Sequence, residues 1–547
     1  MLLIHDTSSS ETPYELTFED RYGELCSHAW YGDGFIMVAF RRGYLVFVST
    51  HSKEMVKEVG RLSLVPDGID ALAYSPVLGR AAVAGGDGRG RGVEIRVVEQ
   101  TGENKWEELG EQPSYLPPHC GTVSQLGWTD DGQILTVATR SGNVYNFLAR
   151  MPVLHDACGP RVALLTSLRE VTVLDAVAAT ARTQADPSQT DVDLGRAITV
   201  PVEVEPAMVA VGPRHVAVGM NNRVWFYAAE ETHRDLENER EYLGTVECIR
   251  LNSDFAAVLT NGQVHLHLIQ RPAHPGEERA RTFPDRVGDA ASCVALTEQF
   301  LLFGTQRGSV HIFSLAAWQP LSGAELRHTH PIRGLWPNQA GTRYFFHDSE
   351  GNAFVQAPVG NVTVQVPACP ERVQCVLWDA DDWGVFVVCQ SRELHSYHYA
   401  PLTMQGPQVV KLGPVRLMEN GETEMEPRVT RISPSLSPIA CQGGVVTCQD
   451  ETKLRAFVLG THRPLLGDRH RFGPEQRLKA FAAALGLSRL EQAWELALTL
   501  REEARPAWLA LSAKAMEQLD IEVAARVYRQ LGDAAMVMAL EELAHVE

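Results

Sequence analysis

A short β-meander recurs along most of this chain, and this repeat constrains the fold more than any other feature of the sequence. Each copy has a short apolar strand, a turn with Gly or Asp-Gly, a second apolar strand, and a tight turn into an alternating third strand. Ten copies are present, and they begin near Cys26, Ile69, Ser124, Val162, Val209, Cys248, Ser292, Gly334, Val373 and Ile432. Turn chemistry explains the pattern, because Asp33-Gly34 and Asp131-Gly132 supply the positive-φ positions of a tight hairpin. Each unit is therefore predicted to be an antiparallel meander.

The spacing of the units favours a β-propeller. Most units lie about forty residues apart, which is the period of a four-stranded propeller blade. The Trp-Asp dipeptide typical of the third strand of WD blades is missing there, and Trp378-Asp379 lies at the end of a first strand instead. The blades are therefore degenerate. Stacked β-sandwiches are the alternative, but they rarely repeat one meander so many times.

The number of units predicts two rings rather than one. Closed propellers usually have about 4–8 blades, so ten units do not fit one ring. The stretch Ala149–Pro160 follows the third unit, and seven units remain after it. We therefore expect the last blades of a first propeller over 1–155 and a seven-bladed second propeller over 156–468. Three blades cannot close, so we expect the chain to begin inside the first ring.

Four polar inserts interrupt the blades. They are Thr180–Arg196, Glu230–Glu241, Arg271–Gly288 and Ala400–Arg428. Their composition favours mobile surface loops over further domains. We expect solvated loops there, with protein contact as the second interpretation.

The segment 469–547 has a different, helical texture. It is dense in Ala, Leu, Glu and Arg, and its apolar residues recur at i, i+3 and i+4. The predicted helices are Glu475–Leu485, Leu490–Leu500, Pro506–Met516, Ile521–Leu531 and Ala534–His545. We expect Gly486 to end the first helix, Ser488 to cap the second, and Gly532-Asp533 to end the fourth and cap the fifth. Paired helices of this length predict the start of an α-solenoid of the tetratricopeptide (TPR) kind, with a compact capping bundle as the alternative.

Signatures of chemistry are scarce in this sequence. It has no GxSxG, GxxxxGK[ST] or HExxH motif. The glycine run Gly85–Gly92 precedes a strand rather than a helix, so a hairpin loop is favoured over a nucleotide site. The pairs His265/His267 and His395/His398 lack a carboxylate or Cys at ligand spacing, and the 10 cysteines form no CxxC. The sequence therefore predicts no catalytic, cofactor-binding or metal-binding residues, and a chain that is not an enzyme.

Charge and hydropathy limit the partners that we expect. With 68 acidic and 49 basic residues, the net charge of −19 disfavours nucleic acid and anionic membrane surfaces. Neither a signal peptide nor an apolar segment long enough to span a membrane is visible in the sequence. We therefore expect a cytoplasmic protein that acts through other proteins.

Several specific segments carry a family resemblance. They are Trp30-Tyr-Gly-Asp-Gly34, Leu126-Gly-Trp-Thr-Asp-Asp-Gly-Gln133, Leu165-Thr-Ser-Leu-Arg-Glu-Val-Thr-Val173, Ala217-Val-Gly-Met-Asn-Asn-Arg-Val-Trp-Phe-Tyr227 and Ala525-Arg-Val-Tyr-Arg-Gln-Leu-Gly532. With them, nearly the whole chain resembles the intraflagellar transport complex A (IFT-A) subunits of the WD repeat-containing protein nineteen type. Vesicle-coat and endosomal tethering subunits share the propeller–solenoid plan and are the alternative. A propeller enzyme with a site in the central channel is a further rival.

The resemblance implies a function and a location. Members of this family are scaffold subunits of a hetero-oligomeric complex that supports retrograde transport and the entry of membrane-protein cargo into the cilium or flagellum. Their partners are other IFT-A subunits and ciliary cargo adaptors, and their location includes the basal body. The family plan also has a complete first propeller, a long solenoid and a C-terminal zinc segment. This sequence lacks most of these parts, so we expect a fragment.

Overall fold

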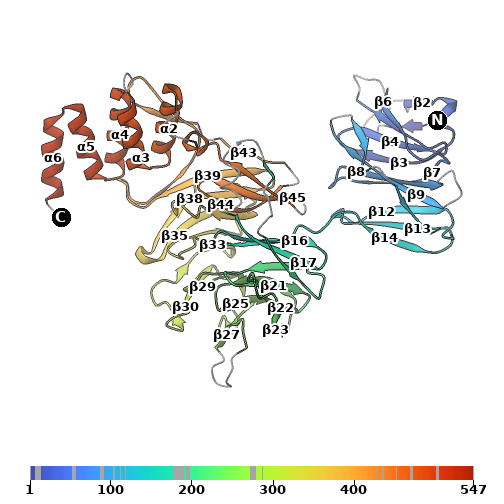
Figure 1. Ribbon diagram of the computed structural model, residues 1–547, viewed down its shortest axis with the longest axis horizontal. Coiled ribbons are helices and arrows are strands. Elements are labelled where there is room, and N and C mark those ends of the chain that lie inside the picture. Colours follow the sequence, from blue (N-terminus) through green and yellow to red (C-terminus); the bar gives the residue numbers. More distant parts are fainter. Residues whose placement is uncertain are drawn as a thin grey trace. The chain divides into compact units, whose positions relative to one another are not determined.

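The computed structural model describes most of the chain. The described residues are 2–5, 14–51, 57–86, 92–102, 105–110, 113–117, 119–176, 190–191, 197–271, 279–285, 288–426, 428–433, 436–450, 453–467, 472–500 and 504–545. They form two compact units, Met1–Pro152 and Val153–Glu547. Each unit is described by itself below (Figure 1).

The first unit contains three antiparallel sheets and one small hairpin. The hairpin pairs β1 (Leu2–Ile4) with β2 (Tyr14–Leu16). The three sheets contain β3 (Leu25–Tyr31), β4 (Phe35–Phe40), β5 (Tyr44–Ser49) and β6 (Lys57–Ser63); β7 (Ile69–Ser75), β8 (Arg80–Gly86), β9 (Val93–Gln100), β10 (Trp106–Glu108) and β11 (Ser114–Tyr115); and β12 (Val123–Trp128), β13 (Ile134–Thr139) and β14 (Val144–Leu148). The short helix η1 (Asp20–Tyr22) precedes the first sheet.

The second unit contains seven sheets of the same design. The first four contain β15 (His155–Cys158), β16 (Arg161–Ser167), β17 (Glu170–Asp175) and β19 (Ile198–Pro201); β20 (Met208–Val211), β21 (His215–Met220), β22 (Arg223–Ala228) and β23 (Leu236–Glu241); β24 (Val246–Leu251), β25 (Phe255–Thr260), β26 (Gln263–Leu268) and β27 (Ala280–Phe283); and β28 (Ala291–Leu296), β29 (Phe300–Thr305), β30 (Ser309–Ser314), β31 (Gln319–Pro320) and β32 (Leu326–Arg327).

The remaining three sheets continue the series around the ring. They contain β33 (Ile332–Pro337), β34 (Tyr344–Asp348), β35 (Ala353–Ala357) and β36 (Val362–Gln365); β37 (Cys375–Trp378), β38 (Val385–Gln390), β39 (Glu393–Ala400), β40 (Gln408–Lys411) and β43 (Thr430–Arg431); and β18 (Thr190–Asp191), β44 (Leu436–Gln442), β45 (Val445–Asp450) and β46 (Lys453–Val458). Short helices η2 (Pro358–Gly360) and η3 (Arg463–Leu465) lie outside the sheets.

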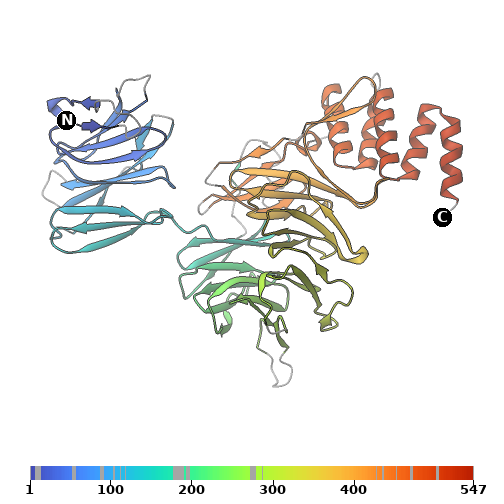
Figure 2. The same cartoon turned by 180° about the vertical axis from the view of Figure 1, so that it is seen from behind.

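The seven sheets form a closed ring (Figure 2). The first strand of each sheet lies against the first strand of the next, from β15 and β20 around to β37 and β44, and β44 in turn contacts β15. The chain also closes the seventh sheet with a strand from an earlier segment, because β18 pairs antiparallel with β46. These contacts confirm the mainly β fold class and the prediction of one seven-bladed ring preceded by three blades.

Turn geometry explains why these residues form blades. Gly43 has a φ of 82°, and a Cβ there would lie 1.7 Å from the carbonyl oxygen of Val65. Gly308 has a φ of 84°, and a Cβ there would lie 2.4 Å from the carbonyl oxygen of His328. Only glycine adopts such a backbone without strain and clash. The second turn of the repeat is therefore specified by its glycine.

The cores lie between neighbouring sheets rather than in one central mass. One cluster, for example, joins Ala257 and Leu266 of one blade to Val294 and Phe303 of the next. The alternating strands thus bury one face against the preceding blade and the other face against the following blade. Burial on both faces accounts for the nearly continuous apolar runs of the second strands, such as Phe255–Thr260.

Within the described ranges, five helices follow the ring, as predicted. They are α2 (Pro474–Gly486), α3 (Leu490–Thr499), α4 (Ala504–Glu517), α5 (Ile521–Leu531) and α6 (Ala534–Ala544). Gly532 ends α5 with a φ of 76°, and the Asp533 side chain accepts a hydrogen bond from the Met536 N–H. The prediction for Ser488 is wrong, because Arg489 is the N-cap residue of α3 and no side chain caps that helix. The Ser488 hydroxyl instead accepts a hydrogen bond from the side-chain amide of Gln518 in the α4–α5 turn.

The prediction of solvated loops is wrong for three inserts. The insert Glu230–Glu241 contains β23, and Arg271–Gly288 contains β27. Within Ala400–Arg428 lie β40 and a separate hairpin of β41 (Val415–Leu417) and β42 (Thr423–Met425). The fourth strand of a blade lies at its outer edge and is polar, so composition alone does not distinguish it from a loop. Most of the insert Thr180–Arg196 lies outside the described residues.

Candidate functional site

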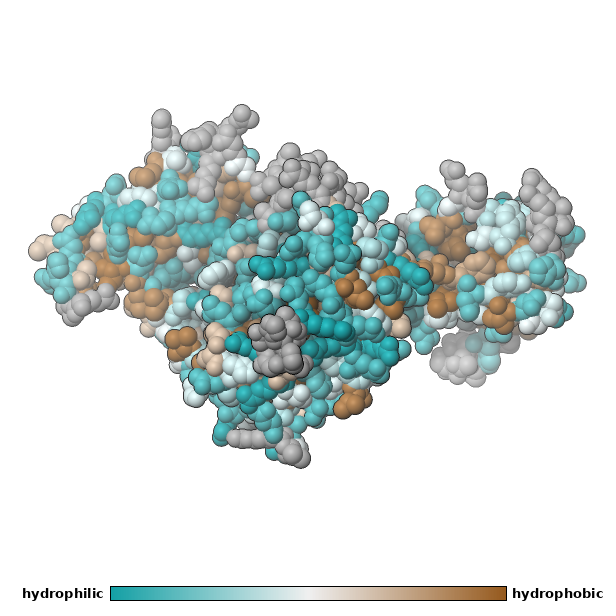
Figure 3. All heavy atoms as spheres, turned by 60° about the horizontal axis from the view of Figure 1, so that its bottom comes forward, coloured by the Kyte–Doolittle hydropathy of each residue, from teal (hydrophilic) through white to brown (hydrophobic). Residues whose placement is uncertain are grey.

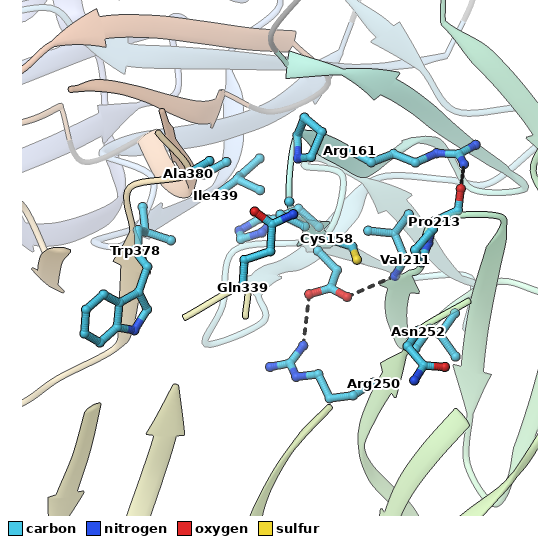
Figure 4. A pocket seen from close by; sticks show the side chains of 18 of the residues that line it. Cys158, Arg161, Val211, Pro213, Arg250, Asn252, Gln339, Trp378, Ala380 and Ile439 are labelled. Carbon is cyan, nitrogen blue, oxygen red and sulfur yellow. Dashed lines mark hydrogen bonds and ion pairs between the residues drawn. The ribbon is translucent and has the colours of Figure 1, made fainter. Parts of the chain in front are cut away.

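The inner strands of the second unit surround a central cavity of about 1030 Å³ (Figure 4). Its wall is formed mostly by the first strands and the turns that follow them, together with residues of the first two blades such as Asp175, Ile198 and Glu230. Figure 4 shows Arg250 directed toward the carboxylate of its ion pair, while Arg161 extends toward Pro213. This cavity is the candidate site for any chemistry in the ring.

A partly buried ion pair occupies one wall of the cavity. The Asp156 carboxylate lies 2.9 Å from a guanidinium nitrogen of Arg250 and accepts a hydrogen bond of 3.0 Å from the Val211 N–H. Burial raises the pKa of Asp156, although Arg250 opposes this shift. Both carboxylate oxygens are thus used in linking three blades, β15, β20 and β24. The pair has the chemistry of a structural link between strands.

The other cation of the wall is also used within the protein. The Arg161 guanidinium donates hydrogen bonds to the carbonyl oxygens of Pro213 and Ala229 in the neighbouring blade. Burial lowers the pKa of Arg161. Arg161 therefore connects the first and second blades of the ring.

The thiol and imidazole of the cavity wall are poorly suited to nucleophilic catalysis. Burial, together with the charges of Asp156 and Glu298, raises the pKa of Cys158 to about 12. Burial lowers the pKa of His155 to about 4. A nucleophilic cysteine needs a lowered thiol pKa. At neutral pH both groups are neutral, and Cys158 carries almost no thiolate.

Asp379, at the end of β37, is saturated with hydrogen bonds. One oxygen accepts from the N–H groups of Asp381, Asp382 and Gly443, and the other accepts from the N–H of Gly444 at 2.7 Å. The side chain is fully buried. The unusual placement of Trp378-Asp379 thus serves to hold the sixth and seventh blades together.

The histidine pairs singled out in the sequence lie apart from this cavity and act as sheet residues. His267 contacts the Tyr242 hydroxyl at 2.6 Å and the Leu268 carbonyl oxygen at 2.8 Å, while His265 lies between two threonine hydroxyls. Burial lowers the pKa of His398 to about 4. His395 lies 3.6 Å from the Glu393 carboxylate. Among the described residues, no group of three or more His, Cys, Asp or Glu side chains could hold a metal ion.

The glycine run joins two paired strands. Gly85 and Gly86 end β8, and Gly92 directly precedes β9, which pairs antiparallel with β8. The residues between them, 87–91, lie outside the described part of the chain. The two ends of the run therefore fit a hairpin connection between blade strands.

The sequence did not predict the contacts at the junction between the ring and the helices. Arg489, before α3, lies 3.1 Å from the Asp382 carboxylate of the β37–β38 turn and 3.3 Å from His462. The hairpin β41–β42 contacts α2, where the Val415 side chain would lie 2.5 Å from a Cβ at Gly486. The alternation Val415-Arg-Leu417 within the insert was the available signal. It is too short to distinguish a strand from a loop.

Hydrophilic side chains prevail on the face of the ring shown in Figure 3. Isolated apolar residues project at loop tips, such as Leu243, which is fully exposed, and Val359, which is 93% exposed. Such loop tips are ordinary protein-contact positions. No helix within the described ranges is long and apolar enough to cross a membrane.

Comparison with known proteins identifies similar sequences over the full chain. Residues 162–462 match the family model of the WDR19 second beta-propeller, and residues 1–142 match that of the WDR19 first beta-propeller. The chain is 33% identical to mouse WD repeat-containing protein 19, 34% identical to the human protein of that name, and 24% identical to WD repeat-containing protein dyf-2 of Caenorhabditis elegans. Each match covers 100% of this chain and 38% of the relative.

Proposed function

This chain belongs to the WD repeat-containing protein 19 (WDR19) family, and from that premise we propose that it is a non-enzymatic scaffold subunit of the intraflagellar transport A complex. The observation that carries the proposal is the match of two successive propeller models to the two units of the chain. In this role the chain supports retrograde transport and the entry of ciliary membrane-protein cargo. We propose the division 1–155, 156–468 and 469–547 for its last first-propeller blades, second propeller and TPR-like helices.

The chemistry of the cavity supports a scaffold rather than an enzyme. Asp156, Arg161, Arg250 and Asp379 are all used in hydrogen bonds or ion pairs between blades. The thiol of Cys158 and the imidazole of His155 are held neutral by burial. The polar groups in the ring thus fix its shape, and a fixed shape is what a scaffold requires.

The proposed partners are other IFT-A subunits and ciliary cargo adaptors, held in a hetero-oligomeric complex at the cilium or flagellum, the basal body and the cytoplasm. A stable interface with each partner would bury about 1,000 Å² or more in total. The exposed loop tips on both faces of the ring offer such contacts. Leu243 lies in the connection from a fourth strand to the next blade, and Val359 lies in a turn from a third to a fourth strand. These two connections lie at opposite ends of the strands, so Leu243 and Val359 lie on opposite faces of the ring.

The test is co-purification of the tagged full chain from ciliated cells, followed by identification of the bound proteins. We expect IFT-A subunits to be recovered. Leu243→Asp and Val359→Asp form a matched pair, because each adds one charge to an exposed tip without disturbing the core. If one face of the ring binds a subunit, the variant on that face should no longer co-purify with this subunit, while the variant on the opposite face should still do so. Recovery of vesicle-coat or endosomal tethering subunits alone would show that the assignment is wrong.

A further inference from the structure

Two cysteines lie directly opposite each other in the sixth blade of the ring. Cys375 of β37 and Cys389 of β38 are register partners on antiparallel strands. Opposite residues project to the same face of a sheet, with Cβ atoms about 4.5–5.5 Å apart. A disulfide requires Cα atoms about 4.4–6.8 Å apart, which neighbouring antiparallel strands provide. The Cα separation of such register partners therefore permits a disulfide, which forms once the two Cβ atoms approach to about 3.5–4.5 Å.

The two thiols differ in their access to solvent. Cys375 is half-buried and lines the central cavity. Cys389 is 1% exposed and lies in the apolar core between the sixth and seventh blades, together with Cys441 and Cys448. The sulfur of Cys375 lies 3.9 Å from the carbonyl oxygen of Pro438 on the seventh blade. A small molecule in the cavity can therefore reach Cys375 before Cys389.

We propose that Cys375 and Cys389 form an oxidisable dithiol, which a peroxide entering the cavity converts into a reversible disulfide. In the first step, the Cys375 sulfur attacks hydrogen peroxide, the O–O bond breaks, and one water leaves while a sulfenic acid forms. In the second step, the Cys389 sulfur attacks the sulfur of that sulfenic acid. The S–S bond forms, the S–O bond breaks, and the hydroxyl leaves with the thiol proton as a second water. The two thiols supply two electrons, and the peroxide accepts them.

The environment of Cys389 assigns the order of the two steps. The hydrogen bond with Cys375 and burial together raise the pKa of Cys389 well above its usual value. A protonated thiol is a poor nucleophile toward peroxide, so Cys389 acts second, where the short distance compensates for its low reactivity. The second step should accelerate as pH rises, because more thiolate becomes available.

The disulfide would lie at the base of a hairpin that contacts the helices. The strands β37 and β38 are joined by the turn that contains Asp382, the partner of Arg489. A bond between Cys375 and Cys389 would fix these strands relative to each other at the end opposite this turn. The same two strands thus carry the oxidation site at one end and the contact with the helices at the other.

The experiment treats the folded full chain with hydrogen peroxide, alkylates the remaining thiols, and maps the peptides by mass spectrometry. We expect a linked Cys375–Cys389 peptide, which dithiothreitol removes. Cys158→Ser is the matched control, because Cys158 also lines the cavity but lies opposite Arg161 and not another cysteine. This variant should form the linked peptide as the wild type does.

In Cys389→Ser the second step is impossible, so the linked peptide should be lost and Cys375 should proceed to sulfinic acid. A thermal melt establishes that each variant is folded. The peptide map of the oxidised wild type tests the proposal by itself, without any variant. A linked Cys375–Cys448 peptide in place of Cys375–Cys389 would overturn the proposal. So would a Cys375 that stays reduced at peroxide concentrations that oxidise Cys158.

Discussion

At the scale of single residues, polar groups in this protein stabilise the turns between blades. Asp379 is the clearest case, because one buried carboxylate accepts four backbone hydrogen bonds from two blades. Hydrogen bonds to an ionised acceptor are stronger than neutral ones, and a buried donor without a partner is costly. The sequence could show that Trp378-Asp379 is misplaced for a WD blade. It could not show this role, since the donors Gly443 and Gly444 lie more than sixty residues away.

Asp379→Asn tests this role. The substitution places an amide donor against backbone donors, so we expect a loss of about 3 kcal/mol in the free energy of unfolding of the ring. Urea denaturation followed by circular dichroism measures it. Asp381→Asn is the control, because that carboxylate is exposed and accepts a hydrogen bond from the Gln442 side chain at the surface. An equal loss in both variants would contradict the structural role of Asp379.

Buried neutral histidines predict a loss of stability in acid. Burial lowers the pKa of His267 and of His462 to about 4, and these residues are 2% and 1% exposed. In the unfolded chain an ordinary histidine has a pKa near 6.5, so the unfolded state binds more protons between about pH 6.5 and 4. Stability should therefore fall as pH decreases through this range, by about 2 kcal/mol per histidine at pH 5.

The measurement is the unfolding free energy at pH 7.5 and pH 5 for the wild type and His267→Gln. The variant keeps a polar partner for Tyr242 but cannot take up the proton, so its pH dependence should be smaller. His233→Gln is the control, since the side chain of His233 is 52% exposed. If His267→Gln has the same pH dependence as the wild type, burial of His267 does not cause the acid sensitivity.

At the scale of elements, prediction from sequence depended on how many neighbours each element needs. The helix Ile521–Leu531 was predicted with its observed bounds, because its amphipathic pattern and the Gly532-Asp533 boundary are local signals. The outer strands β23, β27 and β40 and the hairpin β41–β42 were predicted as loops. Their residues are polar, and only pairing with a neighbouring strand or packing against a helix makes them regular. Local composition does not contain that information.

Arg489→Gln tests the contact between such elements. It removes the partner of Asp382, whose side chain is 21% exposed, and we expect a loss of about 1–3 kcal/mol in local stability at the ring–helix junction. Hydrogen–deuterium exchange should increase in the turn between α2 and α3 and in the β37–β38 turn. Arg529→Gln is the control, because its ion pair with Glu541 is about half exposed and should contribute little. Unchanged exchange at both turns would mean that apolar packing alone holds the helices.

At the scale of the whole molecule, the sequence predicted how many blades the second unit has but not how its ring closes. The count of seven came from repeats that each copy displays by itself. One of the two closing contacts is made by β18, a two-residue strand within the insert Thr180–Arg196, which pairs with β46 more than 260 residues later. A strand of two residues has no detectable period, so no sequence pattern could reveal it. The same reasoning explains the missed ion pair between Asp156 and Arg250, which only the closed ring brings together.

Closure of the ring by β18 can be tested with proline. Thr190→Pro/Asp191→Pro removes the N–H donors of β18, so pairing with β46 should be lost and the seventh blade should have only three strands. Two contacts close the ring between the seventh and first blades: β18 with β46, and β44 with β15. Without the first contact, the ring is closed by β44 and β15 alone and should open more readily. We expect a lower melting temperature and new proteolytic cleavage near β44–β46.

The control is Gln319→Pro in β31, which is also a two-residue outer strand and already contains Pro320, but closes no ring. That variant should lose only local pairing and keep the wild-type melting temperature within about 1–2 °C. Equal destabilisation in the two variants would show that β18 serves as an ordinary outer strand, and that the inner strands alone keep the ring closed.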